Sequence, residues 1–493
     1  MNYILTSHKK GKISNREFTK TKIICTIGPS SDNKETLEKM IQAGLDVARL
    51  NFSHGSHDWH KEIFNQIRSI SDETTILFDL QGPKIRLGEV QGKQTLIQGH
   101  DITLTTDEII GDKDRVNVSL DTITKSVKKN DLIYINDGII GLRVLSIVDN
   151  DIKCKILSTG EITSKKGVNI PNVNLDVPCL TEKDLDDLDF ALELEPDYIA
   201  LSFVRSHTDV QDLRKIITNA DLNIPIISKI EHAFAISNFD RILKESDAIM
   251  VARGDLGIET SVTKLPVLQK QLINKSNREG KPVITATQML ESMTNNPRPT
   301  RAEASDVANA IYDGTDAVML SAETAVGKYP VETIEIMNKI ALNVDKELHW
   351  RDFPKMKYDG KDEISENLAS AAGMLVENMP IKAIIAFTEG GFSAKIIAKH
   401  RPKARIFVAT PRKKVIRQLG LIWGCYPLLV KEYQNTDQMV VETVDVAKKL
   451  GYIKDEDIIA IISGSVLSPG KTNLLRAYRV GDLPSPNEFN AII

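Results

Sequence analysis

Short apolar runs alternate with amphipathic segments along most of the chain from about residue 20. In segments 33–44 and 210–220 the apolar residues recur at intervals of three and four, which predicts helices with one buried face. Apolar runs that alternate with such helices are typical of parallel strands. Eight runs of this kind occur, at 22–28, 46–53, 76–81, 197–203, 225–231, 248–255, 282–288 and 316–323. Eight strand–helix units predict an α/β fold built on a closed (β/α)8 TIM barrel rather than an open sheet.

The pattern changes between the third and fourth runs. The stretch from Arg86 to Pro171 is rich in β-branched residues, contains turn signals such as Asn136-Asp137-Gly138, and has no helical period. It predicts a small all-β domain, residues 86–171, inserted in a barrel loop. A domain in this place would overhang the mouth of the barrel, where it could close like a lid.

The strand, loop and helix pattern begins again near residue 355. It predicts a separate C-terminal α/β domain at 355–493. The barrel would then consist of residues 21–85 and 172–350, preceded by a polar tail at 1–20.

The composition restricts the class of protein and its cellular location. The 493 residues include 41% hydrophobic and 26% charged residues, without an apolar run long enough to span a bilayer or a secretion signal at the start, so we expect a cytoplasmic globular protein without membrane contact. The net charge of −4 gives no basic field for a nucleic acid. The cysteines lack metal-ligand spacing and are expected to be reduced; they are Cys25, Cys154, Cys179 and Cys425.

Polar and charged residues collect at the carboxyl ends of the predicted strands. This is the end of a (β/α)8 barrel that carries catalysis. Any one of these residues could be an ordinary loop residue in solvent, but together they favour an active site. They are Asn51, Ser53, Asp79, Ser202, Lys229, Glu231, Asp255, Thr287 and Glu323.

Lys229 and Glu231 carry the strongest chemical signal. They are two apart in one strand and therefore point to the same side. They could simply pair with each other, or they could serve a site. Asp255 follows the next strand, and two close carboxylates beside Gly254 suit a Mg²⁺ ion that completes its shell with substrate oxygens and water. Lys229 would then be a positive charge for a phosphate group.

Seven motifs in register closely resemble the pyruvate kinase family. They are ISKIE, VARGDLG, ARLNFSHG, GPKIR, KKGVN, ATQMLESM and PRPTRAE, and the resemblance covers nearly the whole chain from about Lys20. It implies a phosphotransferase that moves the phosphoryl group of phosphoenolpyruvate to ADP, giving pyruvate and ATP in the last step of glycolysis. It also implies a homotetramer.

The resemblance assigns roles to single residues. Lys229 matches the residue that neutralises the phosphoryl group in flight, Arg49 matches the phosphate-binding arginine, and Thr287 lies near the enolate carbon. Gly254 and Asp255 match positions that meet the substrate carboxylate. Glu231 and Asp255 match the ligands of Mg²⁺, with Mn²⁺ as an alternative ion. The nucleotide-contacting positions are Asn51, His54, Arg86 and Lys166.

The chain departs from the family pattern near its monovalent-cation site. Members that use K⁺ hold it with residues matching Asn51, Ser53 and Asp79, and with a glutamate in the following segment. Here Leu80 replaces the usual threonine and Lys84 replaces that glutamate. A tethered ammonium supplies the same charge and repels K⁺, so we expect that K⁺ is not required. A second departure, His232-Ala233-Phe234 after ISKIE, lies farther from the chemistry.

Two segments of the C-terminal part resemble the halves of an allosteric phosphate-effector site. The segment 464–472 has five residues between its glycines and so fails the Walker A motif. The segment 388–393 lies between a strand and a helix, where free N–H groups favour phosphate. Ordinary turns are the alternative. The candidate effector residues are Thr388, Ser393, Ser465 and Lys471.

Two other functions compete with this interpretation. One is a Mg²⁺-dependent aldolase or lyase that acts on a pyruvate enolate, and the other is a catalytically lapsed sensor of sugar phosphates. Lys166 and His54 favour a nucleotide substrate and hence a kinase over a lyase. The presence of Lys229, Glu231, Asp255 and Thr287 disfavours a lapsed enzyme.

Overall fold

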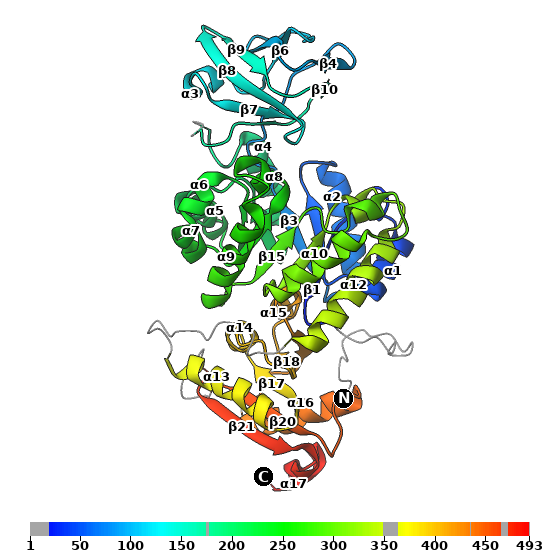
Figure 1. Ribbon diagram of the computed structural model, residues 1–493. Helices are drawn as coiled ribbons and strands as arrows, with labels where there is room; N and C mark the ends of the chain where they lie inside the picture. Colours follow the sequence, from blue (N-terminus) through cyan, green and yellow to red (C-terminus); the bar gives the residue numbers. More distant parts are fainter. Residues whose placement is uncertain (1–18, 174–176, 349–362, 434, 465–471, 493) are drawn as a thin grey trace.

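The computed structural model describes residues 19–173, 177–348, 363–433, 435–464 and 472–492. The chain forms three regions in a row, with a β-rich region above, a barrel in the middle and an α/β region below (Figure 1). We call the first the inserted region (residues 86–171) and the last the C-terminal region (from residue 363).

The middle region is a closed barrel of eight parallel strands, which confirms the predicted (β/α)8 fold. The strands pair around the barrel in the order β1, β16, β15, β14, β13, β12, β3 and β2, so the inserted region interrupts the sequence between two neighbours, β3 and β12. The strands are β1 (Lys22–Thr26), β2 (Val47–Asn51), β3 (Thr75–Asp79), β12 (Tyr198–Leu201), β13 (Ile226–Ile230), β14 (Ala248–Ala252), β15 (Val283–Ala286) and β16 (Ala317–Leu320).

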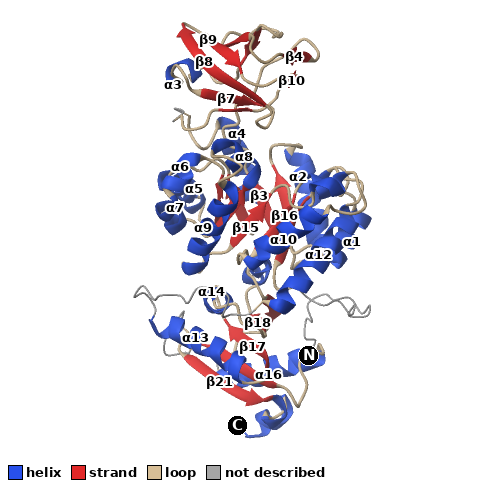
Figure 2. Ribbon diagram, viewed as in Figure 1, coloured by secondary structure: helices blue, strands red, loops and turns tan. Residues whose placement is uncertain are grey.

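Helices surround these strands, as Figure 2 shows. Their ends follow local chemistry: the side chain of Asn33 accepts a hydrogen bond from the N–H of Thr36 at the start of α1, and Gly44, with φ of 132°, ends it. The helices of the barrel are α1 (Lys34–Ala43), α2 (His57–Ile70), α4 (Glu182–Leu194), α5 (His207–Asn219), α6 (Ala233–Ser237), α7 (Phe239–Glu245), α8 (Arg253–Glu259), α9 (Leu265–Arg278), η1 (Glu291–Thr294), α10 (Arg301–Tyr312), α11 (Ala322–Ala325) and α12 (Pro330–Glu347).

One strand boundary was wrong. The predicted run 248–255 placed Asp255 at the end of a strand, but β14 ends at Ala252 and Asp255 lies in the first turn of α8. The apolar run stops at the same residue as the strand. A carboxylate is favoured in a first helical turn because the helix dipole is positive there.

The inserted region is built mainly of strands, as predicted. A six-stranded sheet in the order β11, β7, β8, β9, β5, β6 lies beside a two-stranded one of β10 and β4. Its one helix in the described residues is a single turn. The elements are β4 (Gln94–Leu96), β5 (Asp101–Thr105), β6 (Arg115–Asn117), α3 (Ile123–Ser126), β7 (Leu132–Ile135), β8 (Ile140–Val148), β9 (Asp151–Ile156), β10 (Gly160–Ile162) and β11 (Val168–Asn169).

The C-terminal region is a five-stranded sheet with helices, in the order β19, β18, β17, β20, β21, and only β21 runs antiparallel to its neighbour. Its elements are α13 (Glu363–Asn378), β17 (Ile381–Phe387), α14 (Phe392–Lys399), β18 (Arg405–Thr410), α15 (Lys413–Gln418), η3 (Leu419–Leu421), β19 (Cys425–Leu429), α16 (Thr436–Lys449), β20 (Ile458–Ser463), β21 (Leu474–Arg479), η4 (Val480–Asp482) and α17 (Pro486–Ile492).

The C-terminal region closes the bottom of the barrel. Leu421 of η3 is fully buried and packs in the same apolar cluster as the inward residues of the barrel strands, such as Tyr198 and Ile227. The hydroxyl of Tyr198 donates to the carbonyl of Gln418 at 2.9 Å. The barrel interior is therefore completed by a side chain from another part of the sequence.

None of the helices within the described ranges has the length and apolar character needed to cross a bilayer.

Candidate active site

The top layer of the barrel interior is polar. Side chains alternate along a strand, so the residue two positions after an inward apolar residue also points inward. The apolar layer of the barrel interior includes Val47, Leu77, Ala200 and Ile227. Two positions toward the mouth from each of these stand Arg49, Asp79, Ser202 and Lys229. The strand period therefore brings four residues from four strands into one layer.

Hydrogen bonds join this layer into one network. The Nζ of Lys229 lies 2.6 Å from the Oγ of Ser202 and 3.2 Å from Oδ1 of Asp79. Nε of Arg49 donates to Oδ2 of Asp79 at 2.7 Å, and its Nη1 donates to Oγ1 of Thr26 at 2.8 Å. Asp79 is fully buried and connects the two cations.

The network is charged. Burial by itself would raise the pKa of Asp79, but Lys229 and Arg49 outweigh it and lower that pKa below its usual value. Burial would lower the pKa of Lys229, yet Asp79 and Glu231 raise it overall. The layer therefore holds two cations against two carboxylates, Asp79 and Glu231, at the mouth of the barrel.

Glu231 and Asp255 form the second part of the site. Oε1 of Glu231 lies 3.1 Å from Nζ of Lys229, so the predicted pairing of these two residues exists, and Oε2 accepts the N–H of Phe203 at 2.9 Å. Burial raises the pKa of Glu231; Lys229 opposes this and the neighbouring Asp255 carboxylate adds to it. Within the described ranges no group donates a hydrogen bond to the Asp255 carboxylate.

A divalent cation fits this pair of carboxylates. Their oxygens are the ligands that Mg²⁺ prefers, and a cation between them would relieve the repulsion that raises the pKa of Glu231. Two protein ligands leave most of the coordination shell to water and substrate.

Thr287 occupies a strained position beside Gly254. Its φ is +66°, which is unusual for a β-branched residue, and Gln288 after it has φ of +53°. The Oγ1 of Thr287 accepts the N–H of Gly254 at 2.9 Å. Nη2 of Arg253 donates to the carbonyls of Thr287 at 2.8 Å and of Gln288 at 3.0 Å, so Arg253 holds this turn.

Arg253 was missed in the sequence. It is only 6% exposed, and Nη1 also donates to Asp306 at 2.7 Å. Its place directly before Gly254 and Asp255 was the available signal. Ser202 was noted as a polar strand end, but its hydrogen bond to Lys229 could not be read from spacing.

The candidate nucleotide residues lie around one edge of the mouth. Arg86 forms an isolated β-bridge with Gly167, next to Lys166, and its Nη1 donates to the carbonyl of Lys165 at 3.0 Å. Burial and the nearby cations Arg86, Lys84 and Arg49 lower the pKa of His54. Three candidates are thus brought together at a cationic edge; the fourth, Asn51, accepts the N–H of Ser53 at 3.2 Å.

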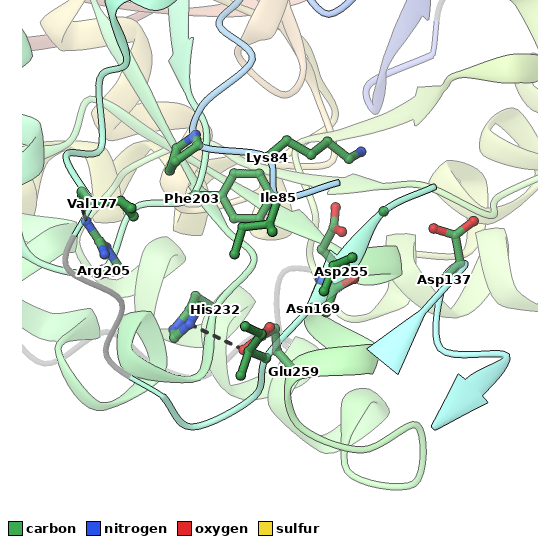
Figure 3. Close-up of a pocket in the computed structure, with 14 residues that line it drawn as sticks. Lys84, Ile85, Asp137, Asn169, Val177, Phe203, Arg205, His232, Asp255 and Glu259 are labelled. Atoms are coloured by element: carbon green, nitrogen blue, oxygen red, sulfur yellow. Dashed lines mark hydrogen bonds and ion pairs between the residues drawn. The ribbon is translucent and has the colours of Figure 1, made fainter. Parts of the chain in front are cut away.

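A pocket lies between the barrel mouth and the inserted region. It encloses about 630 Å³ of empty space, part of it open to solvent. Figure 3 shows Asn169 of the inserted region close to Asp255 and Glu259 of the barrel, with Asp137 of the inserted region farther to the right. His232, one of the departures from the family pattern, lies 3.4 Å from Glu259.

Lys84 also lines this pocket and is exposed. Among the described residues it forms no ion pair with Asp79, whose carboxylate is held by Lys229 and Arg49. The Lys84 charge contributes to lowering the pKa of His54, after burial and Arg86.

The candidate effector residues are only partly described. Oγ1 of Thr388 accepts the N–H of Gly391 at 2.9 Å, and the buried hydroxyl of Ser393 lies 2.7 Å from that of Thr472. Ser465 and Lys471 lie outside the described residues.

The fold and the mouth of the barrel define a class, a (β/α)8-barrel enzyme with cations and carboxylates arranged for an anionic substrate. Comparisons with known proteins give the family. Residues 18–334 match the model "Pyruvate kinase, barrel domain", and residues 366–478 match "Pyruvate kinase, alpha/beta domain".

Curated relatives and a solved structure agree. The chain is 44% identical to a pyruvate kinase of Staphylococcus haemolyticus and 43% identical to one of Sporosarcina psychrophila, in each case over 94% of this chain and 81% of the relative. It is similar to a crystal structure of a pyruvate kinase from Cryptosporidium parvum, with a TM-score of 0.87, 37% identity, and coverage of 94% of this chain and 96% of that one.

The chain belongs to the pyruvate kinase family, whose members are phosphotransferases that generally use a divalent metal. The predicted family, fold and enzyme class are confirmed.

Proposed function

We propose that this chain transfers the phosphoryl group of phosphoenolpyruvate to ADP, giving pyruvate and ATP, at the mouth of the barrel. The observation that carries the proposal is the position of Lys229, whose buried ammonium contacts Ser202, Asp79 and Glu231 beside Asp255. A fixed cation in a site with little water stabilises charge on a transferring phosphoryl group strongly.

The reaction breaks the bond between phosphorus and the enol oxygen, and the electron pair remains on that oxygen as an enolate. Arg49 binds the phosphoryl oxygens, and Lys229 neutralises the charge as it moves between donor and acceptor. Arg49 is held ready by Asp79 and Thr26, so little reorganisation is needed when the substrate binds.

The second half-reaction adds a proton to the enolate carbon. Thr287 is a weak acid by itself, so its role is to position a water that delivers the proton. Its hydroxyl donates to the carbonyl of Ala286 at 2.7 Å and accepts from Gly254. Arg253 fixes the backbone that aims this hydroxyl, and the main chain of Gly254 and Asp255 meets the substrate carboxylate.

Glu231 and Asp255 would hold Mg²⁺, and Mn²⁺ could take its place. When bound, such an ion neutralises substrate oxygens that share its coordination shell. Asn51, His54, Arg86 and Lys166 would bind ADP. Since Lys166 belongs to the inserted region, nucleotide binding would draw that region over the mouth and exclude water.

A coupled assay of pyruvate formation tests the activity. We expect pyruvate to form only when phosphoenolpyruvate, ADP and Mg²⁺ are all present. Pyruvate formation from phosphoenolpyruvate without ADP, or release of pyruvate from a larger carbon acid, would contradict the kinase and favour a lyase. A lapsed sensor would give no turnover.

We also propose that K⁺ is not required, because Lys84 supplies a tethered positive charge at the mouth. The initial rate at saturating substrates should change less than about twofold when K⁺ is replaced by a large organic cation. Lys84→Glu should make the rate depend on K⁺, whereas Lys113→Glu, which changes an exposed lysine of the inserted region, should not. A wild-type rate that collapses without K⁺ would refute the idea.

Several wider features are part of the same proposal. A phosphorylated effector would bind near Thr388, Ser393, Ser465 and Lys471, and the enzyme would be a cytoplasmic homotetramer. The division into a tail at 1–20, a barrel at 21–85 and 172–350, a lid at 86–171 and a C-terminal domain at 355–493 is supported by the sheets, which fall within these ranges. Sedimentation with and without a sugar phosphate tests the tetramer and the effector.

A further inference from the structure

A second cavity lies at the opposite end of the barrel from the active site. The barrel contributes Asn277, Lys281 and Asp316, and the C-terminal region contributes Lys395 and Lys399 of α14, together with Arg401. The cavity is partly open, and its empty space of about 240 Å³ includes solvent at the open side. Figure 1 shows α14 on the side of the C-terminal region that faces the barrel. We call this second cavity the interdomain cationic cavity.

The lining of this cavity carries four cations and one carboxylate. That carboxylate, Asp316, is paired with Arg401 at 3.1 Å. Lys399 donates to Glu366 at 2.9 Å, which leaves it further N–H groups. Lys281 donates to three carbonyls, at 2.7, 2.8 and 2.6 Å, so it adds charge to the cavity without a free N–H group.

Lys395 is the exception in this lining. In the part of the chain that the structure describes, its ammonium donates no hydrogen bond and forms no ion pair. Burial lowers its pKa, and the more distant Asp247 opposes this effect. Lys395 in turn lowers the pKa of Lys281, so the two like charges act on each other. Lys395 is half-buried, and an ammonium partly shielded from water beside other cations is costly unless an anion accompanies it.

We propose that the interdomain cationic cavity binds a small oxyanion of the phosphate class, held by N–H groups of Lys395 and Lys399 in the positive field of Lys281 and Arg401. A multiply charged oxyanion matches the excess of cations, and the small volume excludes a larger organic body. Both N–H donors belong to α14, and the barrel adds the charge of Lys281 on the other side of the cavity, so the bound anion would attract the two regions to each other.

This site is separate from the candidate effector loop. Ser393 and Lys395 are two residues apart on α14, which places them about 200° apart around the helix. The hydroxyl of Ser393 faces Thr472 of its own region, whereas Lys395 lines the cavity against the barrel. The inference does not depend on the catalytic proposal.

Thermal unfolding of the full chain tests the site, with inorganic phosphate as the probe in a buffer free of other multivalent anions. Phosphate should raise the unfolding temperature of the wild type in a saturable way, and Lys395→Met should lose at least half of that shift. Lys382→Met, which removes an exposed lysine from β17 of the same region, should keep the full shift. Lys395→Arg keeps the positive charge and should keep most of the phosphate-induced shift in unfolding temperature.

A second readout separates an anion site from a structural lysine. Without phosphate, Lys395→Met should unfold at the same temperature as the wild type or a higher one, because it removes like-charge repulsion. A lysine needed for packing would instead lower the unfolding temperature with and without phosphate, and that result, or equal phosphate shifts in wild type and Lys395→Met, would overturn the proposal. Glycerol phosphate tells whether the bound group is free phosphate or the phosphoryl group of an organic molecule. If it raises the unfolding temperature in a way that depends on Lys395, the site accepts a phosphoryl group of an organic molecule. If it does not, the ligand is free phosphate.

Discussion

Two carboxylates at opposite ends of the barrel differ in the hydrogen bonds that they accept. At the bottom, Asp197 before β12 is saturated, because Oδ2 accepts from Arg68 at 2.6 Å and from the N–H of Ile76 at 2.8 Å, while Oδ1 accepts from Arg417 at 2.7 Å. At the mouth, Asp255 has no such donor among the described residues and stands near the buried Glu231. The saturated carboxylate of Asp197 joins the barrel to the C-terminal region, whereas the carboxylate of Asp255 is open to a ligand.

The same strand connects the two ends. Asp197 precedes β12, and Ser202 and Phe203, which bind Lys229 and Glu231, follow it. At the bottom the hydroxyl of Thr75, at the start of β3, also donates to the carbonyl of Arg417. The contrast therefore predicts that changes at the mouth reduce rate without loss of fold, and that changes at the bottom reduce stability.

The largest effect is expected for Lys229→Met. Loss of the fixed cation should reduce kcat by about 1000-fold, or about 4 kcal/mol of transition-state stabilisation, with the circular dichroism spectrum unchanged. The coupled pyruvate assay measures it. Lys215→Met, which removes an exposed lysine from α5, serves as the matched control and should keep full activity. Near-normal turnover of Lys229→Met would remove the basis of the catalytic assignment.

A smaller effect, on stability, is expected for Leu421→Ala. It opens a cavity where η3 fills the bottom of the barrel, and a buried leucine replaced by alanine costs about 2 to 5 kcal/mol. The urea midpoint of unfolding should fall, while kcat of the folded enzyme stays within about threefold of wild type. Ile364→Ala, at a side chain 66% exposed, should change neither value. Equal midpoints for the two variants would show that Leu421 does not close the barrel.

The smallest effect is a pH dependence at Glu259. Burial and the repulsion of Asp255 raise the pKa of Glu259 to about 7, although a hydrogen bond from Asn169 opposes them. Burial lowers the pKa of His232 beside it to about 4, so both groups are mostly neutral between about pH 4 and 7. In the unfolded chain a glutamate titrates near its ordinary value of about 4.3.

The sign follows from these values. Stability from the protonated Glu259 is fully present below pH of about 4 and is lost as pH rises through about 7. Glu259→Gln cannot ionise, so without divalent metal its unfolding temperature should rise relative to that of the wild type between about pH 4 and 7. Thermal scans across this range measure the difference. Parallel curves for the two proteins would mean that Glu259 is ionised throughout.

The sequence predicted the parts of the site that depend on periodicity. A spacing of two placed Lys229 and Glu231 on one side, and the polar carboxyl ends of the predicted strands placed Asp79 and Ser202 at the mouth, whereas Arg49 was assigned only through the family resemblance. It could not show which partners they choose, because those contacts cross between strands whose register depends on the whole barrel. The pairing of Asp79 with both Lys229 and Arg49 is an example.

Other features depend on backbone conformation and long-range packing. The turn at Thr287 has positive φ but contains no glycine, so nothing in the sequence indicated the turn. The hydrogen bonds by which Arg253 holds it could therefore not be predicted. Asp255 was predicted in a strand but lies in a helix, because an apolar run does not show at which residue helical hydrogen bonds begin. The docking of Leu421 and the unpaired Lys395 depend on contacts between distant parts of the chain.

Leu421, which completes the bottom of the barrel, also affects the order in which parts of the chain can fold during synthesis. The last barrel strand, β16, ends at Leu320, about a hundred residues before the side chain that fills the bottom of the barrel. A nascent chain can therefore pair all eight strands while the barrel floor is still open and apolar. Since domains generally fold as units during synthesis, the apolar floor of the barrel stays uncovered until residue 421 has emerged.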